Sequence, residues 1–374
     1  MKIVIVMPVW NEAENIKEMI NVLVKTEFPK IEGDMELLVV DNHSTDGTDK
    51  VVEMASQKNK NIKLIQQKNK GLGWAYVTGI QYAIKNLHAD GILEMDGDFQ
   101  HPPRFVKPMV EAYLAAADYV IGSRYIKGGS VPKEWAASRK AISFFGNLFI
   151  RLVLLNFKIH DLTTGFRLSR VKGNLDKIEL ENLMELDRFA YKVDLLYQSL
   201  KNSKKTVEVP LAFASRTKDE SKFNYKEMIS TFKVAIILGI KDKQKFIKFG
   251  MVGFTGFVIN FIALRIFRKV IGIEIIAWIL STELAIMSNF TLNNIWTFRN
   301  EKIEGIGKLM SKFLQFNLGS VGAIIIQAIA GPIGVGLVGA KYDFLVLGFV
   351  VAFLVLPYNY FIYNRFIWKT NSNH

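Results

Sequence analysis

The 374-residue chain contains no cysteine, which excludes disulfides, thiolate nucleophiles and cysteine-based zinc sites. No Gly-x-Gly-x-x-Gly motif follows the first strand-like run and no P-loop occurs, so a Rossmann dinucleotide site or an ATPase is poorly supported. The apolar run 1–10 is too short for the core of a secretory signal, and no small-residue cleavage site follows it. We therefore expect the chain to begin with a β-strand rather than a signal peptide.

A net charge of +13 is compatible with a nucleic-acid partner or with anionic membrane lipid. Lys and Arg gather around long apolar windows in the second half of the chain, not on one aromatic-interleaved face, which favours membrane lipid over nucleic acid. These windows begin near Phe249, Ile273, Phe313 and Phe344, and each is long enough to span a bilayer. Because the composition changes near residue 240, we predict a soluble domain at 1–224, an interfacial helix or linker at 225–243 and a transmembrane domain at 244–374.

Short apolar runs alternate with helical patterns in the first half of the chain. Continuous apolar runs are typical of strands that are covered on both faces in a parallel sheet. The predicted strands are 2–7, 36–40, 62–66, 91–95 and 119–122, with helices at 15–26, 48–57 and 72–85. This alternation predicts an α/β sheet with crossover helices. Such sheets bind ligands beyond the carboxyl ends of their strands, where this chain has acids, amides and bases.

The stretch Asp96-Gly97-Asp98-Phe99-Gln100 directly follows the predicted strand 91–95. Two carboxylates and an amide oxygen suit Mg²⁺ or Mn²⁺, which can bridge a diphosphate and neutralise its charge as it departs. Gly97 lets the backbone turn without a Cβ clash. An ordinary acidic turn is the alternative, because a bare Asp-x-Asp is common.

Five motifs, in this order, resemble family 2 glycosyltransferases, and within that family the polyprenyl-phosphate sugar synthases of the dolichol-phosphate mannose synthase group. They are Pro8–Glu12, Val39–Asn42, Lys70–Gly73, Asp96–Pro103 and Gly122–Tyr125. The resemblance covers roughly residues 1–225 and implies a GT-A (Rossmann-like) glycosyltransferase domain. Because no Gln-x-x-Arg-Trp motif occurs, a processive polysaccharide synthase is disfavoured.

The resemblance also implies roles for single residues. Asp96, Asp98 and Arg124 are the implied catalytic residues, and Asp96, Asp98 and Gln100 the implied metal contacts. The nucleotide-sugar contacts would be Pro8, Trp10, Glu12, Asp41, Asp96, Gly97, Asp98, Lys192, Arg216 and Lys222. Asn42 replaces a frequent second aspartate of the family, which leaves the base of the nucleotide open.

A phosphate acceptor is already ionised, so it needs cations to hold it rather than a strong general base. Arg124 and Arg139 suit that role by residue type, and the resemblance implies that they and Ser143 contact the acceptor phosphate. Arg139 and Lys140 could instead be membrane-facing charge. Asp161, in a segment that also matches the family, is either a base or a residue that organises its loop.

Two segments have the pattern of helices that lie on a membrane surface. The apolar stretch 141–157 is interrupted by Gly146, Asn147 and Arg151. We predict an interfacial helix over about 138–157, with a core helix as the alternative, and a second candidate at 225–240.

The membrane half contains an internal repeat. Asn289-Phe290 with Asn294, Trp296, Phe298 and Arg299 recurs 70 residues later as Asn359-Tyr360 with Asn364, Phe366, Trp368 and Lys369. We infer two helical hairpins, hence four transmembrane helices with both ends on one side. Positive charge flanks that side, which places the catalytic half and both termini in the cytoplasm. This half resembles GtrA-like membrane domains, which implies anchoring or lipid handling. Glu283, inside the second window, is a functional candidate or simply a paired carboxylate.

Together these features predict a multi-pass enzyme of the cell membrane, a hexosyltransferase that uses Mg²⁺ or Mn²⁺. We expect an inverting transfer of mannose from GDP-mannose to a polyprenyl (dolichyl) phosphate. A UDP-sugar such as UDP-glucose is the alternative donor. A lipid-linked sugar flippase with a degenerate transferase domain is the non-enzymatic alternative, which the intact Asp96, Asp98 and Arg124 disfavour.

Overall fold

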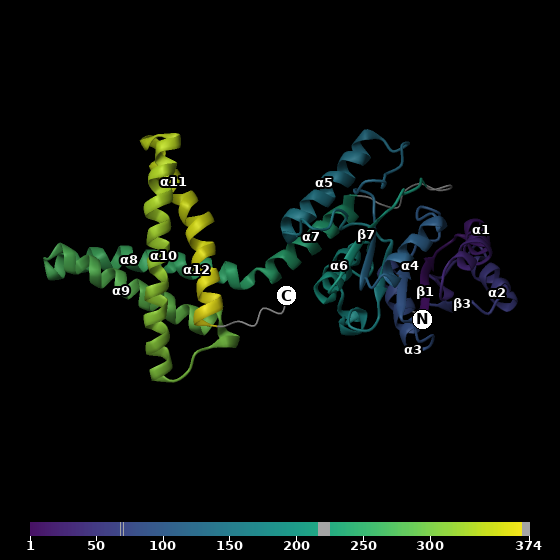
Figure 1. The fold of residues 1–374 in the computed structure, drawn as a ribbon, viewed down its shortest axis with the longest axis horizontal. Helices are drawn as coiled ribbons and strands as arrows, with labels where there is room; N and C mark the ends of the chain where they lie inside the picture. The colour runs from purple at the N-terminus through teal and green to yellow at the C-terminus, as the bar shows by residue number, and fades with distance from the viewer. Residues whose placement is uncertain (68, 70, 216–224, 369–374) are drawn as a thin grey trace. The chain divides into compact units, whose positions relative to one another are not determined.

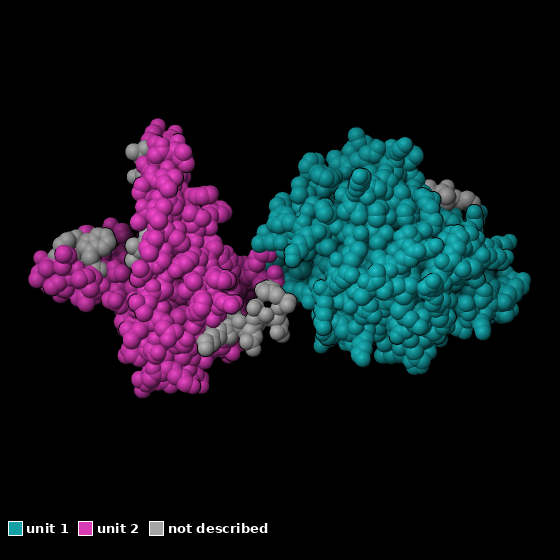
Figure 2. Space-filling view, viewed as in Figure 1, with its two compact units in different colours: residues 1–239 teal, residues 240–374 magenta. Residues whose placement is uncertain are grey.

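The computed structural model describes residues 1–67, 69, 71–215 and 225–368. The chain divides into two compact units, Met1–Gly239 and Ile240–His374 (Figure 2). The first unit holds a β-sheet with helices packed on both faces, and the second is built from helices (Figure 1). The predicted fold class, an α/β domain followed by a helical membrane domain, is confirmed.

In the described residues the first unit forms a seven-stranded sheet with the order β3-β2-β1-β4-β6-β5-β7. All five predicted strands are present, and the structure adds β6 and β7, which were not predicted. The sheet is mixed rather than parallel throughout, because β6 is antiparallel to both β4 and β5. The strands are β1 (Lys2–Val9), β2 (Asp34–Asp41), β3 (Ile62–Gln66), β4 (Gly91–Glu94), β5 (Tyr119–Ser123), β6 (Arg167–Arg170) and β7 (Thr206–Pro210).

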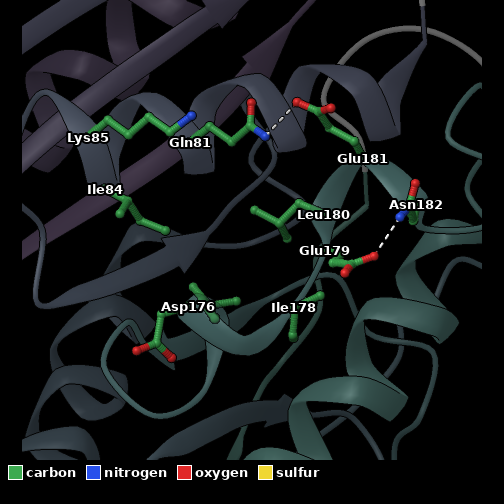
Figure 3. A pocket seen from close by; sticks show the side chains of 10 residues that line it. Gln81, Ile84, Lys85, Asp176, Ile178, Glu179, Leu180, Glu181 and Asn182 are labelled. Atoms are coloured by element: carbon green, nitrogen blue, oxygen red, sulfur yellow. Dashed lines mark hydrogen bonds between the residues drawn. The ribbon is translucent and has the colours of Figure 1, made fainter.

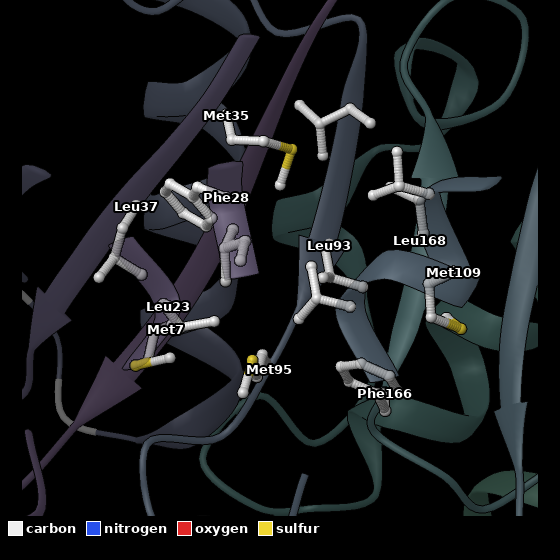
Figure 4. Close-up of a cluster of buried hydrophobic side chains, with 14 of the residues drawn as sticks. Met7, Leu23, Phe28, Met35, Leu37, Leu93, Met95, Met109, Phe166 and Leu168 are labelled. Carbon is white, nitrogen blue, oxygen red and sulfur yellow. The ribbon is translucent and has the colours of Figure 1, made fainter. Parts of the chain in front are cut away.

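Strand β1 is buried from Ile3 to Val9 and divides the core into two layers. Successive strand side chains point to opposite faces. Ile3, Ile5 and Met7 therefore join one apolar cluster, part of which Figure 4 shows, while Val4 and Val6 join the other. Burying each such side chain contributes about 1.5–3 kcal/mol to folding. The continuous burial explains why β1 reads as an unbroken apolar run.

Helices α1 (Ala13–Asn21), α2 (Thr48–Lys58) and α4 (Val106–Leu114) contribute to the first cluster, and α3 (Leu72–Lys85) to the second. Helix α3 lies directly on the sheet because residue 79 is glycine: a Cβ there would collide with Val6 and Val40. A third cluster joins α5 (Ala137–Leu154), α6 (Tyr191–Asn202) and α7 (Tyr225–Asp242) to β5.

The second unit contains, in its described residues, four segments long and apolar enough to cross a membrane: Gln244–Ile271, Ile275–Thr297, Ile306–Val338 and Gly348–Ile367. Glu283 lies on an exposed side of its helix, and no ion pair to it is found in the described chain. The helices are α8 (Gln244–Ile271), α9 (Glu274–Leu292), α10 (Ile306–Val338), α11 (Asp343–Val350) and α12 (Leu356–Ile362).

The halves of this unit make matching contacts. A π-helical turn, Asn293–Thr297, follows α9, and another, Tyr363–Ile367, follows α12 at a spacing of 70 residues. Phe298 and Trp368, also 70 apart, stack on each other with ring centroids 4.4 Å apart and an interplanar angle of 10°. The matching pairs Phe249–Tyr360 and Phe316–Phe290 both have centroid distances of 5.6 Å. Two hairpin repeats remain our proposal for this unit, and these contacts support it.

Candidate active site

One cavity of about 690 Å³ collects residues that follow β1, β4 and β5. This is the carboxyl edge of the sheet, where the sequence predicts the site. Asp41 is buried at the end of β2 and does not line the cavity, while Arg216 and Lys222 lie outside the described residues. The predicted site residues that line it are Pro8, Trp10, Glu12, Asp96, Gly97, Asp98, Gln100, Arg124, Arg139, Ser143 and Lys192.

Another cavity, of about 390 Å³, lies between α3 and the segment 175–182 (Figure 3). Its wall includes a hydrogen bond of 2.9 Å from Gln81 Nε2 to Glu181 Oε1. None of the predicted site residues that the structure describes line it. It is therefore separate from the candidate active site.

The carboxylate of Asp96 is held from several directions at the end of β4. The Tyr76 hydroxyl donates to Asp96 Oδ1 at 2.8 Å, and Lys192 Nζ lies 3.6 Å from Oδ2. The backbone N–H of Asp96 donates to His101 Nδ1 at 3.0 Å. Burial raises the pKa of Tyr76 well above its usual value, so the hydroxyl keeps its proton and acts as the donor.

His101 is buried and neutral. A ring nitrogen that accepts a hydrogen bond carries no proton. Burial also lowers the pKa of His101, which favours the neutral ring. Although His101 Nδ1 is 3.8 Å from Asp96 Oδ2, the two therefore form no ion pair. Among the described residues, Lys192 places a positive charge beside Asp96.

Asp96, Asp98 and Gln100 together present hard oxygen donors to the cavity. Asp98 is buried, and its Oδ1 accepts the backbone N–H of Gln100 at 3.1 Å. Within the described chain no three His, Cys, Asp or Glu side chains form a complete metal site. The donor set fits a divalent cation whose other ligands come from substrate, because one or two carboxylates plus phosphate oxygens commonly hold Mg²⁺.

The end of the cavity near β1 and β2 has the features of a nucleoside site. Trp10 is 47% exposed and offers an aromatic surface. The loop after β1 that carries Trp10 is held by the loop after β2, since the backbone N–H of Asn11 donates to Ser44 Oγ at 2.9 Å. Asp41 Oδ2 accepts the Ser44 N–H at 3.1 Å, but Asp41 Oδ1 is buried with no hydrogen-bond partner among the described residues. An unpaired buried carboxylate oxygen is costly, but Asp41 does not line the cavity, so its predicted contact with the nucleoside stays a prediction.

Arg124, which lines the cavity, forms a bidentate pair with Asp161. Arg124 Nε lies 2.7 Å from Asp161 Oδ2, and Nη2 lies 2.8 Å from Oδ1. The guanidinium also sits between the rings of Tyr125 and Phe213, at 5.3 and 5.5 Å from their centroids. Burial alone would raise the pKa of Asp161, but Arg124 lowers it below its usual value. An ionised, fully paired carboxylate is a poor base, so the structure favours the loop-organising role.

Arg139 and Ser143 lie one turn apart on α5 and both face the cavity. The Arg139 guanidinium lies 4.0 Å from the centroid of Trp135, and Ser143 Oγ is 2.6 Å from the Tyr125 hydroxyl. The same helix exposes large apolar side chains elsewhere, including Phe144, Phe145 and Leu152. Helix α5 thus joins a polar, cavity-facing side to an apolar, exposed side.

Beneath the site lies an ion pair that sequence reasoning missed. Glu94 and Arg167 are cross-strand partners on β4 and β6, and Arg167 Nη2 is 2.6 Å from Glu94 Oε2. Arg167 Nη1 donates to the backbone carbonyl of Lys192, also at 2.6 Å. Both side chains are buried. Tyr76 was missed as well, because burial among apolar neighbours gave it no sequence signal. His101 lies within the motif Asp96–Pro103, but the sequence assigned it no role.

Comparisons with known proteins agree with this architecture. The model of "Glycosyl transferase family 2" matches residues 4–175, and that of the "GtrA/DPMS, transmembrane domain" matches residues 248–368. A dolichol-phosphate mannosyltransferase of Pyrococcus furiosus is 29% identical over 99% of this chain and its own whole length. An undecaprenyl-phosphate mannosyltransferase of Micrococcus luteus is 32% identical over 60% of this chain and 88% of its own length. A polyprenol monophosphomannose synthase of Mycolicibacterium smegmatis is 33% identical over 62% and 84%. The chain therefore belongs to glycosyl transferase family 2, as a hexosyltransferase with a GtrA/DPMS transmembrane domain.

Proposed function

We propose that the protein transfers mannose from GDP-mannose to a polyprenyl phosphate, with inversion at the sugar. The observation that carries the proposal is a single cavity lined by three carboxylates, Glu12, Asp96 and Asp98, and by three cations, Arg124, Arg139 and Lys192. Such a lining suits two anions at once, a nucleoside diphosphate and a second phosphate. The mannosyl relatives support the choice of sugar.

On the donor side, Trp10 would contact the nucleoside, while Asp41, which does not line the cavity, stays a proposal from the sequence alone. Asp96, Asp98 and Gln100 would hold Mg²⁺ or Mn²⁺. When bound, the cation would offset the negative charge of the departing diphosphate. Lys192, whose ammonium group already lies beside Asp96, would add positive charge to the same phosphates. Arg216 and Lys222 stay proposals from sequence alone.

On the acceptor side, Arg139, Ser143 and Arg124 would hold the lipid phosphate. One phosphate oxygen attacks the anomeric carbon while the bond from that carbon to the diphosphate oxygen breaks, which inverts the configuration in one step. The attacking oxygen already carries negative charge, so no proton has to be removed. The low pKa and complete pairing of Asp161 agree with a reaction that needs no base.

The exposed apolar side of α5 would rest on the bilayer and bring the lipid phosphate to the cavity. We propose that this side of the bilayer is cytoplasmic, because Lys and Arg flank the same ends of the membrane helices. Soluble nucleotide sugars would then reach the donor end directly. The domain limits 1–224, 225–243 and 244–374 belong to this proposal.

The test uses purified full-length protein in nanodiscs with Mn²⁺, a polyprenyl phosphate, and radiolabelled GDP-mannose or UDP-glucose. Label from GDP-mannose should enter the lipid phase with wild type and with Glu111→Ala, a surface carboxylate control, but not with Asp98→Ala. Label entering only from UDP-glucose would overturn the donor assignment. Lipid translocation that persists in Asp98→Ala, without any transfer by wild type, would favour the flippase instead.

A further inference from the structure

Tyr76 connects the helical layer of the first unit to the proposed metal site. It lies on α3, far in sequence from Asp96, and its side chain is completely buried in the cluster beneath the sheet. Within the described residues, the hydroxyl makes one hydrogen bond, the 2.8 Å contact to Asp96 Oδ1. A buried hydroxyl needs a partner, and here that partner is a carboxylate that faces a cavity.

The surroundings of Asp96 leave its carboxylate little freedom. The backbone is tied to His101, and Oδ2 lies 3.6 Å from Lys192 Nζ. Lys192 is itself held, because Arg167 binds its backbone carbonyl. Tyr76 adds a fixed, neutral hydrogen-bond donor to Oδ1 of this carboxylate.

We propose that Tyr76 is a positioning residue for the divalent cation: its hydroxyl fixes Asp96 in its binding orientation before the ion arrives. The inference rests on the proposed role of Asp96 as a metal ligand. Hydrogen bonds to a ligating carboxylate commonly raise metal affinity 10- to 100-fold, because the ligand need not be ordered on binding.

Tyr191 provides a matched control on the neighbouring helix α6. Its ring is also completely buried and lies 5.9 Å from that of Tyr76, centroid to centroid. Its hydroxyl, however, has no hydrogen-bond partner in the described chain. Tyr191→Phe thus removes a buried hydroxyl from the same environment without touching Asp96.

The experiment titrates Mn²⁺ into the full-length protein with GDP present and measures free Mn²⁺ by electron paramagnetic resonance. Tyr76→Phe should weaken Mn²⁺ binding about tenfold or more, whereas Tyr191→Phe should stay within about twofold of wild type. Steady-state assays add a second readout: Tyr76→Phe should raise the Mn²⁺ concentration for half-maximal rate, and saturating Mn²⁺ should restore kcat. Thermal unfolding of each variant reports whether it folds.

Equal Mn²⁺ affinity in the two tyrosine variants would overturn the inference. So would a kcat of Tyr76→Phe that stays low at saturating Mn²⁺, since that result indicates a merely structural role. Asp98→Ala separates this outcome from failure of the proposed function. If Asp98→Ala abolishes Mn²⁺ binding and Tyr76→Phe has no effect, only the role of Tyr76 is wrong. If Asp98→Ala also binds Mn²⁺ normally, the proposed metal site itself is wrong.

Discussion

Replacing Arg167 with methionine removes one half of the buried ion pair beneath the active site. Glu94 would then stay 2% exposed, with its closest cation gone. Desolvation alone already raises the pKa of Glu94, and Arg167 is the largest influence that opposes this rise. Breaking a buried pair from one side costs about 3–5 kcal/mol. Because folded domains are stable by only about 5–15 kcal/mol, this single change should be severe.

The matched comparison lies on the same strand. Arg170 pairs with Asp118 at 3.0 Å, but those side chains are 32% and 23% exposed. Arg170 also lies over the ring of Tyr113. A partly exposed pair and a ring contact together are worth at most about 2 kcal/mol, so Arg170→Met should be mild.

The assay is denaturant unfolding of the full-length protein in detergent, as a double-mutant cycle. Arg167→Met and Glu94→Leu should each cost about 3–5 kcal/mol, while the double variant should recover most of the loss, because two apolar groups can replace a buried pair at little cost. Strictly additive losses would refute the reasoning. Equal losses for Arg167→Met and Arg170→Met would do so as well.

Two further predictions concern the acceptor side. Arg139→Gln should raise the KM for polyprenyl phosphate about 10- to 100-fold, because a hydrogen bond to a charged group is worth about 1.5–3 kcal/mol. The KM for GDP-mannose should change less than twofold; equal effects of Lys140→Gln, its neighbour, would instead point to membrane-facing charge. Asp161 has a folded-state pKa below the ordinary value of 3.8, so its contribution to stability is complete above pH 3.8 and is lost as the pH falls through the lower folded value. Unfolding free energies measured from pH 6 to pH 3 should therefore fall more steeply for wild type than for Asp161→Asn, and parallel curves would contradict this assignment.

The sequence predicts much of the sheet because its central strands are continuous apolar runs. Helix 72–85 is also predicted with the limits that the structure gives, since its apolar spacing is regular. Strand β6 escapes prediction because Arg167-Leu168-Ser169-Arg170 is half cationic. The side chain of Arg167 is nevertheless buried, because Glu94 on β4 lies directly opposite it and pairs with it. The charge of Arg167 can be buried only because of a partner 73 residues away in the sequence. A local sequence pattern cannot reveal such a pair.

The candidate site shows the same division. Residues that follow a predicted strand, such as Asp96 and Arg124, are found from position alone. Tyr76 is not, because its spacing on α3 is that of an ordinary core residue and its one polar contact is tertiary. For Asp161 the sequence left two roles open, and its bidentate contact with Arg124 favours one.

The stacked pair Phe298 and Trp368 bears on how such a membrane unit could arise. In the two-hairpin arrangement that we propose, the two rings occupy equivalent positions, and they stack on each other. A contact between the same position of two repeats is self-complementary, as is the interface of a two-fold symmetric dimer. A single hairpin would therefore contain both sides of this interface and could pair with a second copy of itself. When both halves lie in one chain they need not stay identical, and the equivalent positions hold different residues here: Phe298 and Trp368, and Phe290 and Tyr360.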